Sequence, residues 1–149
     1  MTSVDNPKSE AADKLTKPHA DWRQLVSPEE YAVLFEEGTE PSFSHPLNNE
    51  KRKGTFICAA CHLPLFTSDD KFESGTGWPS FMRPIEGNVE MKRDFKLIWP
   101  RTEYHCRRCG GHQGHVFSDG PRPTGQRWCN NGLALTFVPE GDSLRPLRT

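Results

Sequence analysis

Five cysteines give this 149-residue chain its clearest capacity for chemistry. Four of them form two Cys-x-x-Cys pairs, Cys58 with Cys61 and Cys106 with Cys109. Two thiolates at this spacing hold one face of a tetrahedral ion, and two such pairs complete a closed four-sulfur site. The pattern predicts a structural Zn²⁺, with iron in a rubredoxin-like site as an alternative. Two unrelated redox or buried pairs are a further alternative, although neither pair lies in a βαβ pattern of the thioredoxin type.

The fifth cysteine, Cys129, precedes an apolar segment and by itself fits a buried structural thiol as well as a reactive one. Arg127 lies two residues earlier, on the same side of an extended chain, where its charge favours a thiolate. His112 and His115 follow the second cysteine pair, and the turn-rich residues 118–125 fold the chain back toward Cys129. Each histidine also fits a structural, solvated or zinc-binding role, but four cysteines already complete the metal site.

Residues 74–81 form a glycine-rich loop that presents Trp78. No Gly-Lys-Ser/Thr follows the glycines, and Pro79 interrupts a helix start, so the loop does not fit a phosphate cradle. Trp78 therefore belongs either to the core or to the wall of a small apolar pocket.

The elements that must position these residues are predicted to be short. Ser27 caps a helix that starts at Pro28, with Glu30 closing a capping box and Gly38 as its stop. Further along, apolar segments bounded by turn residues predict strands over 54–58, 88–92, 96–99, 115–117 and 133–137. We therefore expect a mainly β fold, with antiparallel sheets in a barrel-like or sandwich packing and a short N-terminal helical region.

The length suits one domain, which we expect over residues 22–140, between a disordered N-terminal tail (1–21) and a loose C-terminal tail (141–149). With 19 basic and 20 acidic residues the formal net charge is −1, which gives no electrostatic reason to expect nucleic acid or an anionic membrane. No apolar stretch approaches the length of a membrane span, and the first residues lack the apolar core of a secretory signal. The expected location is therefore the cytoplasm, where cysteines stay reduced.

Taken together, these motifs resemble the methionine-R-sulfoxide reductase B (MsrB) family from about Trp22 to Phe137. The resemblance rests on residues 37–40, Cys58-x-x-Cys61 with Leu65-Phe66, the loop 74–81, Cys106-x-x-Cys109 with residues 114–117 and 119–121, and Arg127-Trp128-Cys129-x-Asn131. It implies an antiparallel β fold in which the zinc ion lies away from the active site.

By position, the resemblance assigns Cys129 as the nucleophile, Trp78 as the residue packed against the substrate methyl group, and His112 and His115 as active-site histidines. It implies that Asp119, Arg127 and Asn131 line the same pocket, and we also expect Phe81 and Phe117 to bind substrate. Two features depart from the family. Many members have a resolving cysteine where this chain has Thr76, and the usual Ile-Asn-Ser after the nucleophile is Asn130-Asn131-Gly132 here.

The expected reaction is attack of the Cys129 thiolate on the sulfur of a methionine sulfoxide, mainly in proteins, with His115 as first-choice acid and His112 as second. The resulting sulfenic acid is then reduced by a thioredoxin- or glutaredoxin-type thiol, because no second free thiol remains. We expect a monomer. Two other classes compete. A zinc-ribbon binding module needs no Cys129 and normally shows a basic face, and a zinc hydrolase or deaminase needs an open metal position, which four cysteines do not leave.

Overall fold

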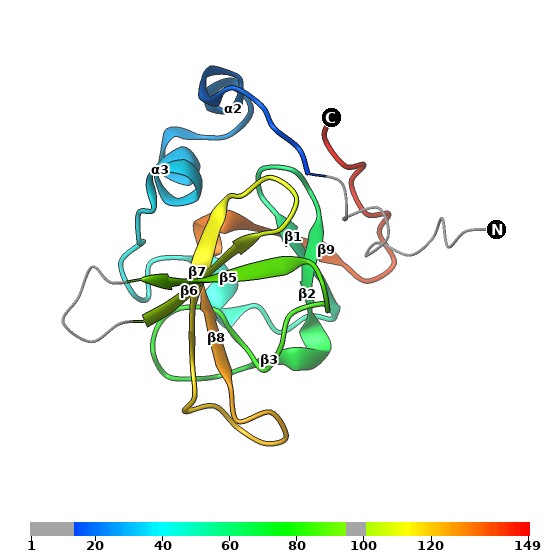
Figure 1. Cartoon of the computed structure of the whole chain (residues 1–149). Helices are drawn as coiled ribbons and strands as arrows, with labels where there is room; N and C mark the ends of the chain where they lie inside the picture. Colours follow the sequence, from blue (N-terminus) through cyan, green and yellow to red (C-terminus); the bar gives the residue numbers. More distant parts are fainter. Residues whose placement is uncertain (1–13, 95–100) are drawn as a thin grey trace.

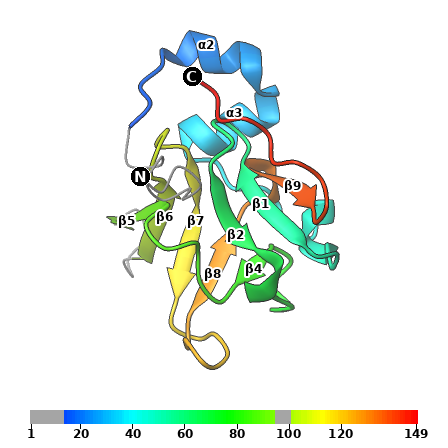
Figure 2. The same ribbon diagram turned by 90° about the vertical axis from the view of Figure 1, so that its right-hand side faces the viewer.

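The computed structural model describes residues 14–94 and 101–149, and it confirms a mainly β fold with two antiparallel sheets and two short helices. The strand predicted over 96–99 lies outside the described residues. Figures 1 and 2 show α2 and α3 together at one end of the sheets, and the loop between β7 and β8 at the opposite end. No helix among the described residues is long and apolar enough to cross a membrane.

The smaller sheet has three strands in the order β2-β1-β9. They are β1 (Gly54–Cys58), β2 (Pro64–Thr67) and β9 (Leu135–Pro139). The second half of β1 is buried throughout, which an apolar run at the centre of a sheet between two packed layers predicts. Where we expected a strand from residue 133, the chain first makes a 3₁₀ turn, Gly132–Ala134.

The larger sheet has six strands in the order β3-β4-β8-β7-β6-β5. They are β3 (Lys71–Phe72), β4 (Ser80–Phe81), β8 (Arg127–Asn130), β7 (His112–Phe117), β6 (Arg101–Cys106) and β5 (Val89–Asp94). This sheet brings Cys106, the two histidines and Cys129 onto the neighbouring strands β6, β7 and β8.

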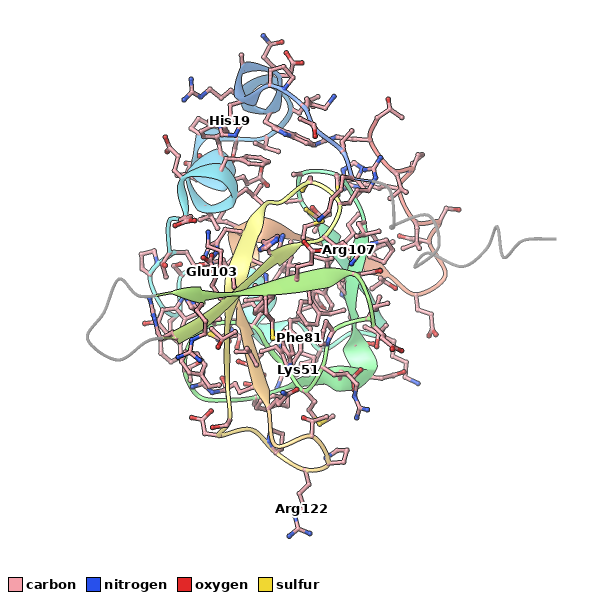
Figure 3. All side chains as sticks on the ribbon, viewed as in Figure 1. His19, Lys51, Phe81, Glu103, Arg107 and Arg122 are labelled. Atoms are coloured by element: carbon pink, nitrogen blue, oxygen red, sulfur yellow. The ribbon has the colours of Figure 1, made fainter. Side chains whose placement is uncertain are left out.

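Aromatic side chains from both sheets form the core between them. Phe81 of β4 stacks on Phe66 of β2 with ring centroids 4.1 Å apart, and it meets Phe56 of β1 edge-on at 5.0 Å. Tyr104 of β6 continues the cluster to Trp128 of β8. Figure 3 shows Phe81 in the interior and Arg122 at the far tip of the β7–β8 loop. The contacts tie the two sheets together behind β8.

The helices α2 (His19–Leu25) and α3 (Pro28–Glu36) pack on one another and cover one end of the core. The predicted capping box is confirmed, because Ser27 accepts from the N–H of Glu30 and the Glu30 carboxylate accepts from the N–H of Ser27. The helix stop differs from the prediction. Glu37, not Gly38, takes the left-handed conformation (φ 55°), while a Cβ at Gly38 would come within 2.9 Å of the Ala32 carbonyl oxygen. Two further 3₁₀ turns are Pro46–Asn49 and Ser68–Asp70.

The two predicted tails differ from expectation where the structure describes them. The first 13 residues lie outside the described part, but Leu15 N donates to Arg108 O at 2.7 Å and α2 begins at His19. The last residues have no regular secondary structure, yet Arg148 N donates to Cys61 O and the Arg148 guanidinium to Ala60 O. Both segments therefore dock on the turns that carry the cysteine pairs.

Candidate active site

Cys129 and His115 are brought side by side by strand pairing. β8 lies between β4 and β7, and the register places Ser80 opposite Cys129 and Cys129 opposite His115. Directly opposed residues of antiparallel strands point to the same face, with Cβ atoms about 4.5–5.5 Å apart. Along β8 the side chains alternate, so that Trp128 and Asn130 are buried while Arg127 and Cys129 stay half-exposed on the other face.

A pocket of about 220 Å³ opens above these two residues. Six of the predicted site residues line it: Trp78, His115, Phe117, Arg127, Cys129 and Asn131. The remaining lining residues were not predicted to bind substrate: Thr39, Thr76, Arg101, Gly114 and Asn130. The pocket has the size of one side chain, with an aromatic wall at Trp78 and the thiol at its base.

Arg127 is held beside the thiol by two partners. Its guanidinium donates to both carboxylate oxygens of Asp119, at 2.9 Å and 3.2 Å, and lies over the Phe117 ring at 4.4 Å from the centroid. Asp119 is itself exposed and does not line the pocket, so it acts on the site through Arg127. A bidentate pair of this kind fixes the orientation of the guanidinium.

The pKa of the Cys129 thiol is raised to about 11. Burial is the main cause, because a thiolate loses its hydration there, and the nearby Glu40 carboxylate contributes to the rise. Arg127 lowers the pKa, as the sequence predicts, but less than burial raises it. Arg127 therefore favours the thiolate, and burial opposes it with the larger effect.

The second histidine, His112, lies behind the first rather than in the pocket. Its ring centroid is 5.6 Å from that of His115, and its Nδ1–H donates to Oε2 of Glu103 at 2.7 Å. Both partners are buried, and Oε1 of Glu103 also lies 3.5 Å from Lys92 Nζ. Burial lowers the pKa of His112, although the carboxylate of Glu103 opposes this shift. His112 can therefore orient or support His115 but does not line the pocket itself.

A buried amide network forms the rear of the pocket. Asn131 Nδ2 donates to the Gln113 backbone oxygen at 2.9 Å, and Asn131 Oδ1 accepts from the N–H of Glu40 at 3.0 Å. Asn130 Oδ1 accepts from the Tyr104 hydroxyl, and Asn130 Nδ2 donates to the Gln113 side chain. These bonds fix the segment that follows Cys129.

Glu40 is a site residue for which the sequence analysis gave no role beyond the family motif. Its backbone oxygen accepts from Trp78 Nε1 at 2.9 Å, and its Oε1 accepts from the N–H of Leu133 at 2.8 Å. Its Oε2 is buried and has no hydrogen-bond partner among the residues that the structure describes. Glu40 thus joins the Trp78 loop to the segment after β8 and places a negative charge near Cys129.

The prediction that Phe81 binds substrate must be corrected, because its side chain does not reach the pocket. Its side chain is 0% exposed and stacks on Phe66 in the core. Phe81 lies next to Ser80 on β4, and successive residues of a strand face opposite sides of a sheet. Ser80 therefore shares the face of Cys129, while Phe81 turns inward.

The two cysteine pairs meet in one cluster away from the pocket. All four sulfur atoms lie within 4.8 Å of one another, with Cys58 3.6 Å from Cys109 and Cys61 3.5 Å from Cys106. A tetrahedral Zn²⁺ with Zn–S bonds of about 2.3 Å needs sulfurs about 3.8 Å apart, so the cluster fits such an ion. Burial raises the pKa of the Cys58 thiol, so a bound cation is what would favour its thiolate. Gly111 N and Gln113 Nε2 point at Cys109 and Cys58 as outer donors.

Comparison with known proteins places the chain in a family. A family model described as the SelR domain matches residues 26–139. The chain is 48% identical over 128 residues to the peptide methionine sulfoxide reductase MsrB of Leptospira interrogans, covering 85% of this chain and 98% of that protein. It is 50% identical over 127 residues to the MsrB of Agrobacterium fabrum (85% and 94%) and 49% identical over 134 residues to that of Methanosarcina mazei (89% and 96%). The chain belongs to the MsrB family. This confirms the resemblance drawn from its motifs.

This MsrB chain has a single cysteine at the pocket. Thr76 lines the pocket together with Cys129, and its hydroxyl is 2.8 Å from that of Ser74. The chain's other four cysteines are all in the cluster. The MsrB pocket therefore offers one thiol, one histidine opposite it and an aromatic wall, which together suit attack on a small polarised sulfur group.

Proposed function

We propose that this chain reduces methionine sulfoxide of the R epimer, mainly in proteins and peptides, to methionine through the thiol of Cys129. The observation that carries the proposal is the opposition of Cys129 and His115 at the base of a pocket walled by Trp78. The chain's similarity to proteins named peptide methionine sulfoxide reductase supports it.

The chemistry requires a soft nucleophile and a proton donor, because a sulfoxide sulfur accepts a nucleophile only when its oxygen is protonated or strongly hydrogen-bonded. The sulfur of Cys129 attacks the sulfoxide sulfur, and His115 supplies a proton to the oxygen. His112 is the second candidate for this acid. The oxygen passes to Cys129, methionine leaves, and the thiol becomes a sulfenic acid. The Cys129 sulfur is thereby oxidised by two electrons, and the substrate sulfur is reduced by two. The number of protons is unchanged, because the thiol of Cys129 loses one proton and the sulfenic acid carries one.

The rest of the pocket is assigned to binding and orientation. Trp78 contacts the S-methyl group of the substrate, and Phe117 supplies a second apolar surface. Arg127, held by Asp119, lowers the cost of the thiolate during attack, and Asn131 keeps the segment after Cys129 in place. Phe81 takes no part because it is fully buried.

The four-cysteine cluster is proposed to hold one structural Zn²⁺. Four protein ligands leave no open position for substrate. Gln113 connects the cluster to the segment that carries Cys129, because its Nε2 approaches Cys58 at 3.6 Å while its Oε1 accepts from Asn130. The ion stabilises the turns that carry the ligands, and the reaction takes place at Cys129.

Turnover requires an external reductant. Two thiols of a thioredoxin- or glutaredoxin-type protein reduce the sulfenic acid, giving a disulfide, water and the Cys129 thiol. Such a reductant fits a protein that works in the cytoplasm. We also propose that the protein acts as a monomer.

Resolved R and S epimers of N-acetyl-methionine sulfoxide, with dithiothreitol as reductant, test the proposal directly. We expect turnover of the R epimer alone and its loss in Cys129→Ser. Thr149→Ser, a substitution to serine at a residue outside the pocket, is the control and should keep activity. Turnover that survives in Cys129→Ser, or a preference for the S epimer, contradicts the proposal.

A further inference from the structure

The side chain of Phe43 is exposed to an extent that needs an explanation. It is 70% exposed, more than any other large hydrophobic side chain of the described residues. Its backbone is also unusual, with φ of 63°, in the left-handed region that bulky residues rarely adopt. A fold gains nothing by holding an aromatic ring in solvent on a strained backbone, so an observed outlier of this kind points to a role in binding.

The position of the ring is fixed from beneath by a glycine. Phe43 N donates to Gly77 O at 2.7 Å, and a Cβ added to Gly77 would come within 2.6 Å of the Phe43 ring carbon Cδ2. Gly77 is buried and has φ of +93°. A second ring in the same loop packs closely against a glycine, because a Cβ on Gly132 would come within 2.4 Å of the His45 ring. The loop that carries Phe43 is thus pinned to the two segments that flank the pocket.

Gly77, against which the Phe43 ring packs, is next to residues that line the pocket. Gly77 lies between Thr76 and Trp78, both of which line the pocket above Cys129. Trp78 Nε1 donates to Glu40 O, and this second bond joins the same two loops. Phe43 itself does not line the pocket, so its exposed face lies beside the mouth and not within it.

We propose that Phe43 is a docking surface for the polypeptide that carries the oxidised methionine, and that it favours apolar residues next to that methionine. The proposal rests on the proposed function. A pocket of about 220 Å³ accepts one side chain, so the polypeptide on either side of it must cross the rim. An exposed aromatic ring at that rim buries apolar surface of a neighbouring residue, which a free amino acid cannot offer. Extended or unfolded segments, in which oxidised methionines are flanked by apolar residues, fit this surface.

The test uses three R-sulfoxide substrates with dithiothreitol as reductant, which removes any effect on docking of a reductant protein. Two are acetylated pentapeptides with the sulfoxide between two leucines or between two glycines, and the third is N-acetyl-methionine-R-sulfoxide. Phe43→Gly removes the ring and accepts the left-handed backbone without strain, and Phe43→Trp keeps an aromatic surface. Leu144→Ser, which also removes an exposed apolar side chain, is the matched control.

We expect Phe43→Gly to lower kcat/KM for the leucine peptide at least fivefold and to leave the other two substrates within twofold of the parent. Phe43→Trp and Leu144→Ser should retain the preference for the leucine peptide. Equal losses on all three substrates, or no loss on any, overturn the inference while leaving the proposed function intact.

Binding of the same peptides to a Cys129→Ser background, measured by calorimetry, separates the two proposals. Weaker binding of the leucine peptide in Cys129→Ser/Phe43→Gly supports the docking surface even if the parent proves unable to turn over any sulfoxide. Equal binding with and without the ring contradicts it. A loss confined to assays with a thioredoxin-type protein would instead assign Phe43 to the reductant and overturn the inference.

Discussion

Cys129 on β8 lies directly opposite His115 on β7, and Ser80 on β4 lies opposite Cys129 on its other side. The separation of the thiol and the imidazole is therefore set by the spacing of hydrogen-bonded strands and does not depend on a mobile loop. Gly114 permits this close pairing, because a Cβ there would come within 1.8 Å of the Cys129 backbone oxygen. Groups held on paired strands keep a fixed geometry between turnovers, which favours proton transfer in step with attack.

Two charge-neutralising variants should shift the Cys129 pKa in opposite directions. Arg127 lowers this pKa and Glu40 raises it, around a value of about 11. Arg127→Met should therefore raise the pKa and slow alkylation by iodoacetamide at a given pH, whereas Glu40→Gln should lower the pKa and speed alkylation. Below the pKa the thiolate fraction of the parent rises about tenfold per pH unit. The measurement is the rate of Cys129 alkylation in the parent and the two variants, followed by mass spectrometry from pH 7 to 9.

Asp119→Asn is the control for this pair, because Asp119 raises the pKa by its charge but also orients Arg127. Its effect should be smaller than either of the other two. Shifts of the same sign in Arg127→Met and Glu40→Gln would show that the variants act through the shape of the pocket and not through charge.

His112 should make the fold less stable in mild acid. Burial lowers its pKa in the folded protein below the ordinary value of 6.5. The unfolded chain therefore binds more protons below about pH 6.5, and stability falls as the pH drops through that value. In His112→Gln the drop in melting temperature between pH 7.5 and 5.5 should be smaller than in the parent. An unaltered pH slope in His112→Gln would contradict the assignment.

Trp78 should set substrate affinity through its apolar surface. Removing one buried apolar contact costs about 1–3 kcal/mol, so Trp78→Ala should raise KM by roughly fivefold or more. Because Trp78 also donates to Glu40 O, Trp78→Phe separates the two roles by keeping the aromatic surface without the hydrogen bond. We expect steady-state kinetics on N-acetyl-methionine-R-sulfoxide to give a much smaller change for Trp78→Phe. Unchanged kinetics in Trp78→Ala would place the side chain outside substrate binding.

Loss of one cluster cysteine should remove the metal. Binding of a structural zinc by small domains is worth roughly 10 kcal/mol or more, so Cys61→Ala should lose the ion and unfold at a much lower temperature. Cys129→Ser should keep one zinc per chain and the parent's melting temperature. Elemental analysis and thermal unfolding of the two variants make the comparison. Active parent protein without bound metal would overturn the assignment, and one iron per chain would replace it by the rubredoxin-like alternative.

Local spacing made the cysteine cluster and the capped helix predictable, because each depends on residues a few positions apart. The strands β2, β3, β4, β6 and β8 were not predicted, and three of them show a physical reason. β4 has only two residues, and β6 and β8 bury polar side chains, Glu103 and Asn130, whose partners lie on other strands. A pattern of apolar and polar residues does not reveal such strands, since burial of a polar group depends on hydrogen bonds from distant segments.

The same limit applies to the site. Its main residues could be named from motifs, but the net effect of charge and burial on the pKa of Cys129 could not be predicted. Arg127 is visible two residues away in the sequence, whereas the desolvation that outweighs it follows only from packing. Glu40 likewise gains its role from burial beside Asn131, far along the chain, and Glu103 gains its role from a hydrogen bond to His112 on the neighbouring strand. Phe81 was misplaced because a motif does not say which face of a strand each residue takes.

The last prediction concerns recycling of the oxidised thiol. Cys129 has no other cysteine among the residues that line its pocket, and the remaining four are in the cluster. After one turnover without reductant, Cys129 should therefore remain a sulfenic acid, react with a dimedone probe and form no disulfide within the chain. Cys129 found joined to a cluster cysteine, with metal released, would refute this.

Thr76→Cys is the constructive form of the same prediction. Thr76, in the loop before β4, and Cys129, on β8, line one pocket, so a thiol at position 76 can reach the sulfenic acid. Attack by that thiol forms a disulfide between positions 76 and 129 and releases water. The variant should form this disulfide in one turnover and become a better substrate for thioredoxin, while Ser74→Cys, two residues away and outside the residues that line the pocket, should not. Peptide mapping of non-reduced protein after a single turnover distinguishes the two variants. If Thr76→Cys also leaves Cys129 as a persistent sulfenic acid, the loop does not approach the thiol closely enough, and the absence of a resolving cysteine is then not what makes the parent depend on an external thiol.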